Sequence, residues 1–314
     1  MKKEYDIIII GSGCSGYAAA MYSGRFQLKT LVLGSILGGT IISTNIVENY
    51  PGFIKISGQE IIDKLKSHAL DYKEFVEIKQ EKVVDIKKMK NCFRIKTDKS
   101  DYISRAIIIA TGTKHRKLGI AGEDKFSGRG VHTCMLCDGF AYRNKIVAVV
   151  GGSDSAAKEV ILGAQLAKKV YMIYRGDKIR PEPINMKRIN NLIKAGKIEI
   201  INNANISEII GDKFVTHVIL DKPYKGSKKF KLDGLFVEIG ADPMSELAKK
   251  LKVKLNKKGE IIIDRESKTN IRGVFAAGDV VDTRFKQAIT GVGEAVSASY
   301  SAYKYISENE VYTC

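Results

Sequence analysis

The chain has 314 residues, 44% of them hydrophobic, which is enough for two domains with sizeable cores. Its formal net charge of +17 comes from lysines and arginines spread along the whole chain, and no basic helix carries interleaved aromatic residues. The charge therefore indicates a solvated surface that attracts acidic partners or anionic cofactors, not a nucleic-acid-binding protein. No apolar run reaches the roughly 18 residues of a membrane span and no signal peptide is recognisable, which predicts a cytoplasmic protein without a membrane segment.

The first predicted elements are a strand at Asp6–Ile10, a helix at residues 16–24 and a strand at Thr30–Leu33. Between the first two lies Gly11-Ser12-Gly13-Cys14-Ser15-Gly16, the full Gly-x-Gly-x-x-Gly fingerprint of a dinucleotide-binding fold. Its glycines make the tight turn, let the backbone approach a pyrophosphate and pack helix on strand, while the helix N-terminus offers amide donors. An acidic ribose ligand is missing, because the second strand ends in Leu33-Gly34-Ser35.

Two kinds of strand are predicted before the middle of the chain. Residues 76–105 alternate apolar and polar side chains between turns, which predicts a small antiparallel sheet. Arg105–Ala110 is then a buried strand that ends in Ala110-Thr111-Gly112. Polar turns near Lys114–Lys117 and Gly240–Pro243 are candidate hinges between two domains.

The five cysteines do not make a disulfide framework, because only Cys134 and Cys137 are closely spaced. A Cys-x-x-Cys pair is a redox dithiol, half of a zinc site or a coincidence. Structural zinc needs four ligands, and the chain has no second Cys pair or His pair, so redox chemistry is favoured. Asp138 follows the second cysteine and could shuttle the proton that thiolate departure requires, with His132 a weaker candidate for that role.

A second nucleotide-binding unit follows the dithiol and suggests an internal duplication. It consists of a strand at Ile146–Val150, a helix at Ser155–Leu166 and a strand at Lys169–Tyr174. Its turn, Gly151-Gly152-Ser153-Asp154-Ser155-Ala156, is a degraded fingerprint, because Ser153 places a side chain where backbone should meet the pyrophosphate.

The residues after that second strand decide which nucleotide the unit prefers. Arg175 and Arg180 could grip the 2′-phosphate of NADPH, because guanidinium groups match phosphate oxygens. Asp177 could instead bind a free 2′-hydroxyl, and two ordinary surface arginines remain an alternative.

The end of the chain returns to buried strands. Strands are expected at Thr216–Leu220 and Leu235–Ile239, then at Val274–Ala277, where Gly278-Asp279 could bind a ribitol or ribose hydroxyl, before a terminal helix. Cys314 has no partner in the nearby sequence and is expected to be an ordinary exposed thiol.

Taken in order along nearly the whole chain, these motifs resemble the low-molecular-weight thioredoxin reductases, class II FAD-dependent pyridine nucleotide-disulfide oxidoreductases. The resemblance rests on the two turns and the dithiol, and on six further segments: Gly38-Gly39, Val47-Glu48-Asn49-Tyr50-Pro51-Gly52, Ala110-Thr111-Gly112, residues 234–240, Gly273-Val274-Phe275-Ala276-Ala277-Gly278-Asp279, and Gln287-Ala288.

The resemblance implies an α/β fold of two Rossmann-like, three-layer nucleotide-binding domains, the second inserted into the first. Residues 1–115 and 244–314 would form the FAD-binding domain, and residues 116–243 the NAD(P)H-binding domain that carries the dithiol. It also implies a homodimer in which electrons pass from NADPH through FAD to the Cys134–Cys137 disulfide, and then to thioredoxin or a similar small disulfide protein.

The family's cofactor-binding positions are carried over residue by residue. Asn49 would lie near the flavin, Asp279 would hold the ribitol chain, and Gln287 with Ala288 would approach the isoalloxazine. The remaining positions expected at FAD are Gly11, Gly13, Ser15, Gly16, Gly39, Thr40, Ala110, Thr111, Gly112, Gly278 and Lys286. Those expected at the pyridine nucleotide are Gly151, Gly152, Ser153, Ser155, Ala156, Arg175 and Arg180.

Several residues depart from the family pattern. Thr40 stands where Gln is usual, Lys286 where Arg is usual, Tyr174 and Gly176 replace His and Arg, and Ser153 replaces Gly. Most of these positions handle the pyridine nucleotide. Two alternatives therefore remain: the same fold and dithiol reduced by ferredoxin or another non-pyridine donor, or a flavin-bound redox sensor without efficient turnover.

Overall fold

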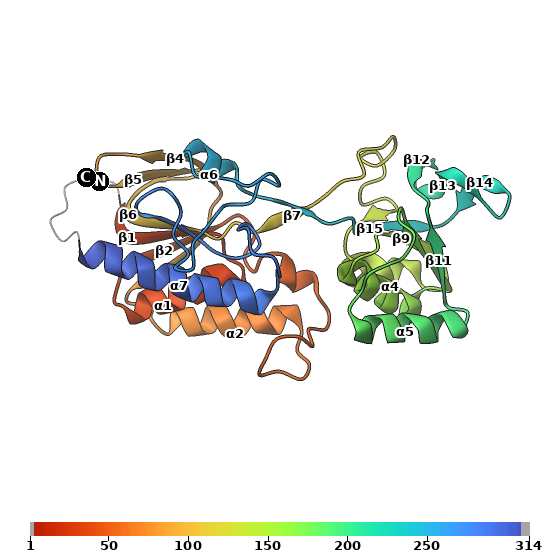
Figure 1. Cartoon of the computed structure of the whole chain (residues 1–314), viewed down its shortest axis with the longest axis horizontal. Coiled ribbons are helices and arrows are strands. Elements are labelled where there is room, and N and C mark those ends of the chain that lie inside the picture. Colours follow the sequence, from red (N-terminus) through yellow and green to blue (C-terminus); the bar gives the residue numbers. More distant parts are fainter. Residues whose placement is uncertain (1–2, 309–314) are drawn as a thin grey trace. The chain divides into compact units, whose positions relative to one another are not determined.

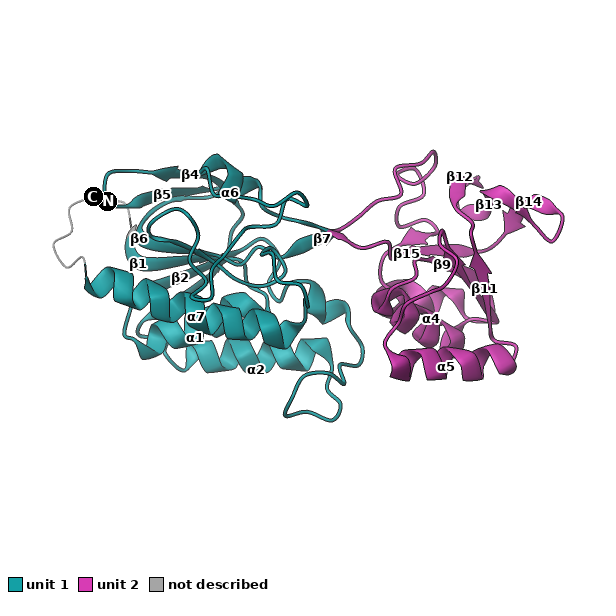
Figure 2. Ribbon diagram, viewed as in Figure 1, with its two compact units in different colours: residues 1–114, 242–314 teal, residues 115–241 magenta. Residues whose placement is uncertain are grey.

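The computed structural model describes residues 3–308, and the chain divides into two compact units. Unit 1 comprises residues 1–114 and 242–314, and unit 2 comprises residues 115–241, so the second is inserted into the first (Figure 2). The two connections between the units follow residues 114 and 241, which is one residue and two residues before the expected boundaries. At these connections β7 (Thr113–His115) pairs with β16 (Ala241–Pro243).

Unit 1 is built on a seven-stranded sheet with the order β3-β2-β1-β6-β5-β4, and β17 pairs with β6 (Figure 1). Strands β1, β2, β3, β6 and β17 are mutually parallel where they pair, whereas β4 and β5 are antiparallel additions. The strands are β1 (Lys3–Ile10), β2 (Thr30–Gly34), β3 (Val76–Gln80), β4 (Val83–Lys88), β5 (Phe93–Thr97), β6 (Asp101–Ile109) and β17 (Val274–Ala276). The helical elements are α1 (Cys14–Arg25), η1 (Thr40–Ser43), α2 (Gly58–Leu70), α6 (Glu246–Lys250) and α7 (Ala288–Ser307).

The run of isoleucines in β1 shows why this sheet is buried on both faces. Ile7 and Ile9 point into the core formed with α1, α2 and α7, whereas Ile8 and Ile10 point into the core on the opposite face. Small residues let α1 and α7 pack closely, since Ala18 and Ala19 on α1 share the first core with Ala298 on α7. A strand with two buried faces is typical of α/β proteins.

The predicted small antiparallel sheet is only partly right. β3 joins the parallel sheet beside β2, and only β4, β5 and β6 pair in antiparallel fashion. The two strands expected on either side of residue 105 are one strand: the first part of β6 pairs with β5, and its last residues pair with β17. Apolar and polar residues do alternate here, but the strands extend the parallel sheet of unit 1 and do not form a separate sheet.

Unit 2 repeats the design on a smaller scale. Its five-stranded sheet has the order β11-β10-β9-β15-β8, all parallel, and a separate antiparallel sheet has the order β12-β13-β14. The parallel strands are β8 (Val131–His132), β9 (Ile146–Val150), β10 (Lys169–Tyr174), β11 (Ile198–Asn202) and β15 (Gly234–Val237). The others are β12 (Ile206–Gly211), β13 (Val215–Tyr224) and β14 (Ser227–Lys231), and the helices are α3 (Met135–Asp138), η2 (Gly139–Tyr142), α4 (Asp154–Leu166) and α5 (Pro183–Lys194).

The strand β9 again separates two cores. Val147 and Val149 pack with the helical side, whereas Ala148 and Val150 pack with the antiparallel sheet. The predicted strands Ile146–Val150 and Lys169–Tyr174 agree with β9 and β10 at both ends. The predicted fold class is confirmed.

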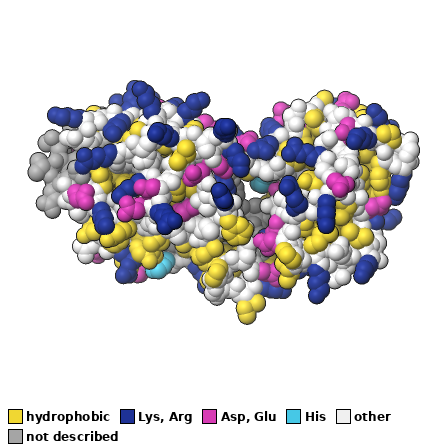
Figure 3. Space-filling model, viewed as in Figure 1, with side chains coloured by type: hydrophobic (Ala, Val, Ile, Leu, Met, Phe, Trp, Pro, Cys, Tyr) yellow, Lys and Arg dark blue, Asp and Glu magenta, His cyan; other side chains and the backbone are white. Residues whose placement is uncertain are grey.

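Lysines and arginines are spread over the face of each unit seen in Figure 3, with acidic side chains among them. This distribution fits the interpretation of the high net charge as solvated surface charge. Among the described residues no helix is long and apolar enough to cross a membrane.

Candidate active site

The first nucleotide turn of unit 1 contains two glycines that the fold itself requires. At Gly11, whose φ is +122°, an added Cβ would lie 2.0 Å from the carbonyl oxygen of Ala110. At Gly16 an added Cβ would lie 2.0 Å from the carbonyl oxygen of Gly11. Both substitutions would collide with backbone, so these two positions close the turn and bring Ala110 against it.

Gly13 is different, because the protein leaves room for a side chain there. An added Cβ would have no neighbour closer than 3.8 Å, the Cα of Gly39. Gly13 is the N-cap of α1, which has no side-chain cap and no acidic residue in its first turn. A helix N-terminus without a side-chain cap fits the pyrophosphate of a dinucleotide, which accepts amide hydrogen bonds and is stabilised by the helix dipole.

The turn at Gly278-Asp279, near the C-terminal end of the chain, packs against the first nucleotide turn. A Cβ on Gly278 would lie 2.5 Å from the Ser15 hydroxyl oxygen, so the two turns are in contact. Desolvation raises the pKa of the Asp279 carboxyl, and this side chain makes no hydrogen bond to another of the described residues. A half-buried carboxylate without a donor is costly, and a ligand hydroxyl would satisfy it.

Glu294 on α7 holds the Gly278 turn in place, and sequence reasoning missed it. Its carboxylate accepts a hydrogen bond of 2.8 Å from the Gly278 amide and another from the Thr283 hydroxyl. Burial raises the pKa of Glu294. The only available signal was one carboxylate among the small residues of the terminal helix.

The other residues expected at FAD also lie in unit 1. The Asn49 amide donates to the Gln287 side chain over 2.8 Å, and Gln287 is the N-cap of α7, which begins at Ala288. Gly39, with a φ of +67°, faces Gly13, since its added Cβ would lie 3.0 Å from the Gly13 Cα. Thr40 begins η1 and is exposed.

Three expected cofactor residues have structural contacts of their own. The Thr111 hydroxyl donates to the Met244 carbonyl over 2.7 Å, and the Gly112 carbonyl accepts from the Met244 amide. The Lys286 ammonium donates to the carbonyls of Asp279, at 2.8 Å, and Val281, and lies 3.0 Å from a Glu260 carboxylate oxygen. Lys286 therefore stabilises the loop that carries Asp279.

In unit 2 the second nucleotide turn has the same backbone closure. A Cβ on Gly151, whose φ is +149°, would lie 2.1 Å from the Glu238 carbonyl oxygen and 2.9 Å from the Cβ of Ala156. The turn differs at its second residue, because an added Cβ on Gly152 would lie 2.4 Å from the ring of Tyr174. The Tyr174 ring also covers Gly176, where an added Cβ would lie 2.7 Å from it.

The candidate specificity residues sit beside this ring. Arg175 and Arg180 are exposed, and the Arg180 amide donates to the Gly152 carbonyl over 2.7 Å. Asp177 accepts a weak hydrogen bond of 3.4 Å from Asn203. Ser153 and Ser155 are exposed at the start of α4. Exposed cations are present, but an aromatic ring covers the turn beside them.

Cys134 and Cys137 form a disulfide with their Cα atoms 5.4 Å apart. Cys134 is buried, whereas Cys137 is exposed. The Cys137 amide donates to the Cys134 sulfur over 3.0 Å, a contact that would stabilise a thiolate there. Among residues 3–308 no group of three or more metal-ligating side chains is arranged around an ion site. The disulfide supports the redox interpretation of the pair.

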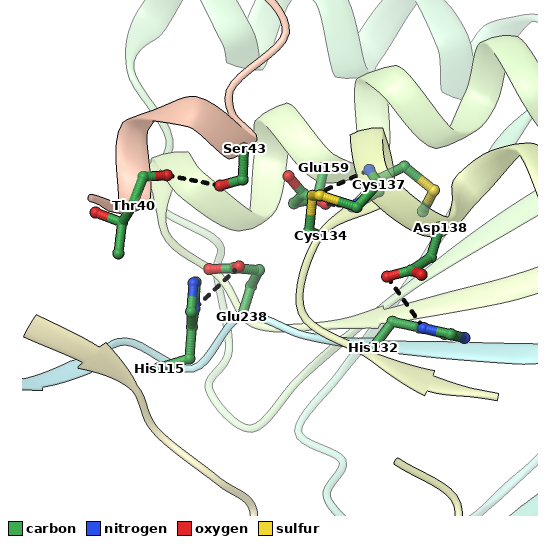
Figure 4. Close-up of a disulfide and its surroundings, with 10 residues drawn as sticks. Thr40, Ser43, His115, His132, Cys134, Cys137, Asp138, Glu159 and Glu238 are labelled. Atoms are coloured by element: carbon green, nitrogen blue, oxygen red, sulfur yellow. Dashed lines mark hydrogen bonds and ion pairs between the residues drawn. A yellow bond between two sulfur atoms is a disulfide. The ribbon is translucent and has the colours of Figure 1, made fainter. Parts of the chain in front are cut away.

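Asp138 lies at ion-pair distance from His132 beside the disulfide (Figure 4). Its carboxylate oxygen lies 3.1 Å from the His132 Nδ1, and the His132 Nε2 lies 2.7 Å from the Tyr142 hydroxyl oxygen. Burial, with the charges of Asp138 and Asp233, raises the pKa of Tyr142 to about 12.

Two buried carboxylates of unit 2 were not predicted from sequence. Glu159 on α4 accepts a hydrogen bond from the amide of Met135, between the two cysteines, and burial raises its pKa to about 7. Glu238 lies 3.4 Å from the His115 ring, and burial together with the charge of Glu159 raises its pKa to about 8. The sequence signal was weak for both: Glu159 is one of two acids in α4, and Glu238 directly follows β15. Cys314 lies outside the described residues.

Comparison with known proteins identifies the family. The model for the pyridine nucleotide-disulphide oxidoreductases matches residues 5–295. A thioredoxin reductase of Listeria innocua is 40% identical over 311 residues, which are 98% of this chain and 95% of the relative.

Solved structures give the same result. The crystal structure of Lactococcus lactis thioredoxin reductase has a TM-score of 0.91 and 37% identity, with 97% of this chain and 99% of that chain covered. A ferredoxin-flavin thioredoxin reductase from Clostridium acetobutylicum has a TM-score of 0.54 and 32% identity, with 98% and 100% covered. The resemblance drawn from the order of the motifs is confirmed, and the chain belongs to the pyridine nucleotide-disulphide oxidoreductases and, among them, to the low-molecular-weight thioredoxin reductases.

Proposed function

We propose that this chain is a thioredoxin reductase that binds FAD in unit 1 and a pyridine nucleotide, NADPH in the first instance, in unit 2. The observation that carries the proposal is the Cys134–Cys137 disulfide within a unit that has its own nucleotide turn. The uncapped helix N-terminus at Gly13 and the Asp279 carboxylate, which makes no hydrogen bond to another of the described residues, support a dinucleotide in unit 1.

When bound, the flavin supplies the two electrons, taken from the reduced nucleotide, that open the Cys134–Cys137 disulfide. The protein's own chemistry then follows thiol–disulfide exchange. One of the two thiolates attacks a sulfur of the substrate disulfide and forms a mixed disulfide. The other thiolate attacks that bond, which releases the reduced substrate and restores the Cys134–Cys137 bond. Two electrons and two protons pass to the substrate.

Asp138 is the proposed proton carrier for this exchange. It follows Cys137 directly, and its amide donates to the Cys134 carbonyl over 3.1 Å, so its position is tied to the dithiol. A carboxyl group within reach of a departing sulfur assists by donating or accepting its proton.

A small disulfide protein of the thioredoxin type is the proposed substrate. Phe140 is 57% exposed and lies three residues beyond Cys137, where it offers an apolar contact next to the reactive sulfurs. The Arg143 guanidinium lies 5.2 Å from the centre of the Phe140 ring and adds positive charge to this contact. The net charge of +17 favours an acidic partner. A homodimer in the cytoplasm completes the proposal.

Reduction by ferredoxin or another non-pyridine donor is the second candidate, because of one observation in unit 2. The Tyr174 ring packs on Gly152 and Gly176, and Ser153 adds a side chain at the turn. Both features work against a nucleotide that must approach the backbone closely. One similar protein is named as a ferredoxin-flavin thioredoxin reductase.

An anaerobic titration of the yellow protein with NADPH and then NADH, following the flavin absorption in the visible, tests the donor. Bleaching by NADPH at low excess is the expected result, and bleaching by neither nucleotide would favour the second candidate. NADH preference would assign the selection to Asp177.

Cysteine variants test the dithiol separately from the donor. Cys134→Ser and Cys137→Ser should each abolish reduction of oxidised thioredoxin, while the flavin is still bleached by the donor. Unchanged turnover in either variant would contradict the dithiol mechanism.

A further inference from the structure

His132 is the residue that we assign a further role: we propose that it is the positioning residue for Asp138 in thiol–disulfide exchange, acting through a Tyr142–His132–Asp138 hydrogen-bond chain. The inference rests on the proposed function and deepens it, because it names what orients the proton carrier of the dithiol.

The geometry fixes the orientation of the imidazole. His132 lies on β8 and its side chain is only 8% exposed, whereas that of Asp138 is 42% exposed. The His132 ring stacks on Phe236, with ring centres 5.4 Å apart and planes inclined by 29°, and meets the edge of Tyr142 at 5.5 Å. The rings hold the imidazole, so its two nitrogens can reach only Asp138 on one side and Tyr142 on the other.

The protonation of Tyr142 decides which group donates in the Tyr142–His132–Asp138 hydrogen-bond chain. Tyr142 keeps its proton at neutral pH, because its pKa is raised to about 12 by burial first and by Asp138 and Asp233 next. Its hydroxyl can therefore donate to the neutral imidazole at Nε2, which leaves the hydrogen on Nδ1, facing Asp138. In the protonated imidazole Nδ1 also carries a hydrogen. In both states His132 donates to the Asp138 carboxylate.

A proton can enter and leave this chain without moving heavy atoms. When Asp138 releases its proton to a departing sulfur, the carboxylate that remains accepts the Nδ1 hydrogen of His132 over the existing 3.1 Å contact. When Asp138 takes a proton from an attacking thiol, that proton stays on the Asp138 carboxyl, and the hydrogens of His132 and Tyr142 keep their places. Each transfer moves one proton and changes no bond between heavy atoms.

Other ionisable groups near the chain must be controlled in any test of pH dependence. Asp233, before β15, acts on Tyr142, and the Lys145 ammonium lies 5.5 Å from the centre of the Tyr142 ring. Glu159, on α4, accepts from the Met135 amide and has a pKa raised by burial to about 7, so it titrates in the working range. The dithiol itself is the remaining group.

Two isosteric variants separate the contacts of the imidazole. His132→Asn can keep a donor at the position of Nδ1 and so retain the Asp138 contact, but it cannot carry an exchangeable charge. His132→Gln extends to the position of Nε2 and can retain the Tyr142 contact while the Asp138 contact is lost. We expect His132→Gln to slow reduction of oxidised thioredoxin about tenfold at neutral pH, within the range of general acid–base effects. His132→Asn should stay within about threefold of the unchanged protein at neutral pH and lose the wild-type pH dependence.

The decisive measurement is a double-mutant cycle with Asp138→Asn, with each rate followed across the pH range. If His132 acts through Asp138, His132→Gln should add no further loss in the Asp138→Asn background, since the two changes share one interaction. An equal tenfold loss in both backgrounds, or an unshifted pH profile in His132→Gln, would overturn the proposal. The shift of the pH profile caused by His132→Gln must persist in the Glu159→Gln background. If the shift disappears there, it comes from Glu159.

A measurement on the reduced protein keeps this test apart from the proposed function. Alkylation of the chemically reduced dithiol by iodoacetamide, as a function of pH, needs neither electron donor nor thioredoxin. A displaced pH profile in His132→Gln, with a smaller displacement in Tyr142→Phe, would support the proposal, because Tyr142 acts on Asp138 only through the tautomer of His132. An unchanged alkylation profile in both would contradict it, whether or not the protein turns over thioredoxin.

Discussion

The two nucleotide turns share one backbone and differ in what fills the space around it. Gly11 and Gly151 both approach a carbonyl oxygen of a neighbouring strand end, at 2.0 Å from an added Cβ for Ala110 and 2.1 Å for Glu238. The strand pairing places β1 beside β6 and β9 beside β15, so Ala110 and Glu238 are equivalent. A small apolar residue occupies the position in unit 1 and a buried acid occupies it in unit 2.

At a second pair of equivalent positions, the larger and the smaller side chain have changed places between the two units. In unit 1 the second turn residue is Ser12, and Gly34 at the end of β2 leaves room for it, because a Cβ on Gly34 would lie 2.0 Å from the Ser12 hydroxyl oxygen. In unit 2 the turn residue is Gly152, and it leaves room for the ring of Tyr174 at the end of β10. In both units the second turn residue contacts the end of the neighbouring strand, but the larger side chain comes from the turn in unit 1 and from the strand in unit 2.

The comparison teaches that a fingerprint describes a backbone turn and not its accessibility. The first turn is open at Gly13. The second carries Ser153 and is covered by Tyr174, and its helix begins with Asp154, whose carboxylate is already bonded to Asn185 and the Glu182 amide. The first turn thus leaves its backbone accessible at Gly13, whereas the second turn is partly occupied by side chains.

The largest predicted effect separates the two kinds of glycine in the first turn. Gly11→Ala should destabilise the flavin-free protein by about 3 kcal/mol, because a Cβ there meets backbone at a positive φ. Gly13→Ala should change that stability by less than about 1 kcal/mol but weaken FAD binding about tenfold, since the added methyl meets protein atoms only at van der Waals distance and would obstruct the pyrophosphate. Urea unfolding of the apoproteins and a flavin titration check both. Equal losses of stability would mean that Gly13 is structural as well.

The size exchange between the units predicts a coupled pair. Gly152→Ser and Tyr174→Gly should each destabilise the protein by about 2 kcal/mol, the first by crowding and the second by lost packing. Together they recreate the Ser12–Gly34 arrangement, so the double variant should be at least about 1 kcal/mol more stable than the sum predicts. Urea unfolding of the four proteins measures this coupling, and strict additivity would show that the two turns are not equivalent.

A smaller effect is expected from restoring the fingerprint in the second turn. Ser153→Gly should lower the KM for NADPH about fivefold with an unchanged kcat, because roughly 1 kcal/mol of steric hindrance is removed from the ground state and the transition state alike. Initial rates with saturating thioredoxin give both constants. An unaltered KM would show that the pyrophosphate does not approach this residue.

The last prediction concerns pH and the buried acid that replaces alanine in unit 2. Burial raises the pKa of Glu238 from the ordinary value of 4.5 to about 8, so the folded protein binds more protons than the unfolded chain between these values. Stability should therefore fall as pH rises from about 4.5 to 8 and level off above. Glu238→Gln should flatten this dependence in thermal unfolding across the same range. A slope that survives would assign it to Glu159, whose pKa is also raised by burial.

Sequence alone was most successful where the signal is local. The apolar strand Ile146–Val150 and the turn after it were predicted at the correct residues, because a buried parallel strand and a glycine turn depend on neighbours in the chain. The Cys134–Cys137 pair was recognised for the same reason, since its three-residue spacing permits the ring that the structure contains. The order of the motifs then gave the family.

The contacts that tune the site depend on residues distant in sequence. Glu294 lies 16 positions from the Gly278 amide that it accepts from, and Gly152 lies 22 positions from Tyr174. The alternating pattern of residues 76–105 could not reveal that β3 joins the parallel sheet, because periodicity identifies a strand and not its partner. A pattern in one segment carries no information about the surface that packs on it.

The sequence by itself determined that this protein has two nucleotide turns, a redox dithiol and an α/β fold, since each is encoded by short spacings of glycine, cysteine and apolar residues. Only the tertiary structure decided that Gly13 leaves room for a methyl group, that Tyr174 covers the second turn, and that His132 joins Tyr142 to Asp138. The physical reason is that burial, which sets both the free volume at a glycine and the protonation of a carboxyl, is a property of the packed neighbours and not of the segment that carries the residue.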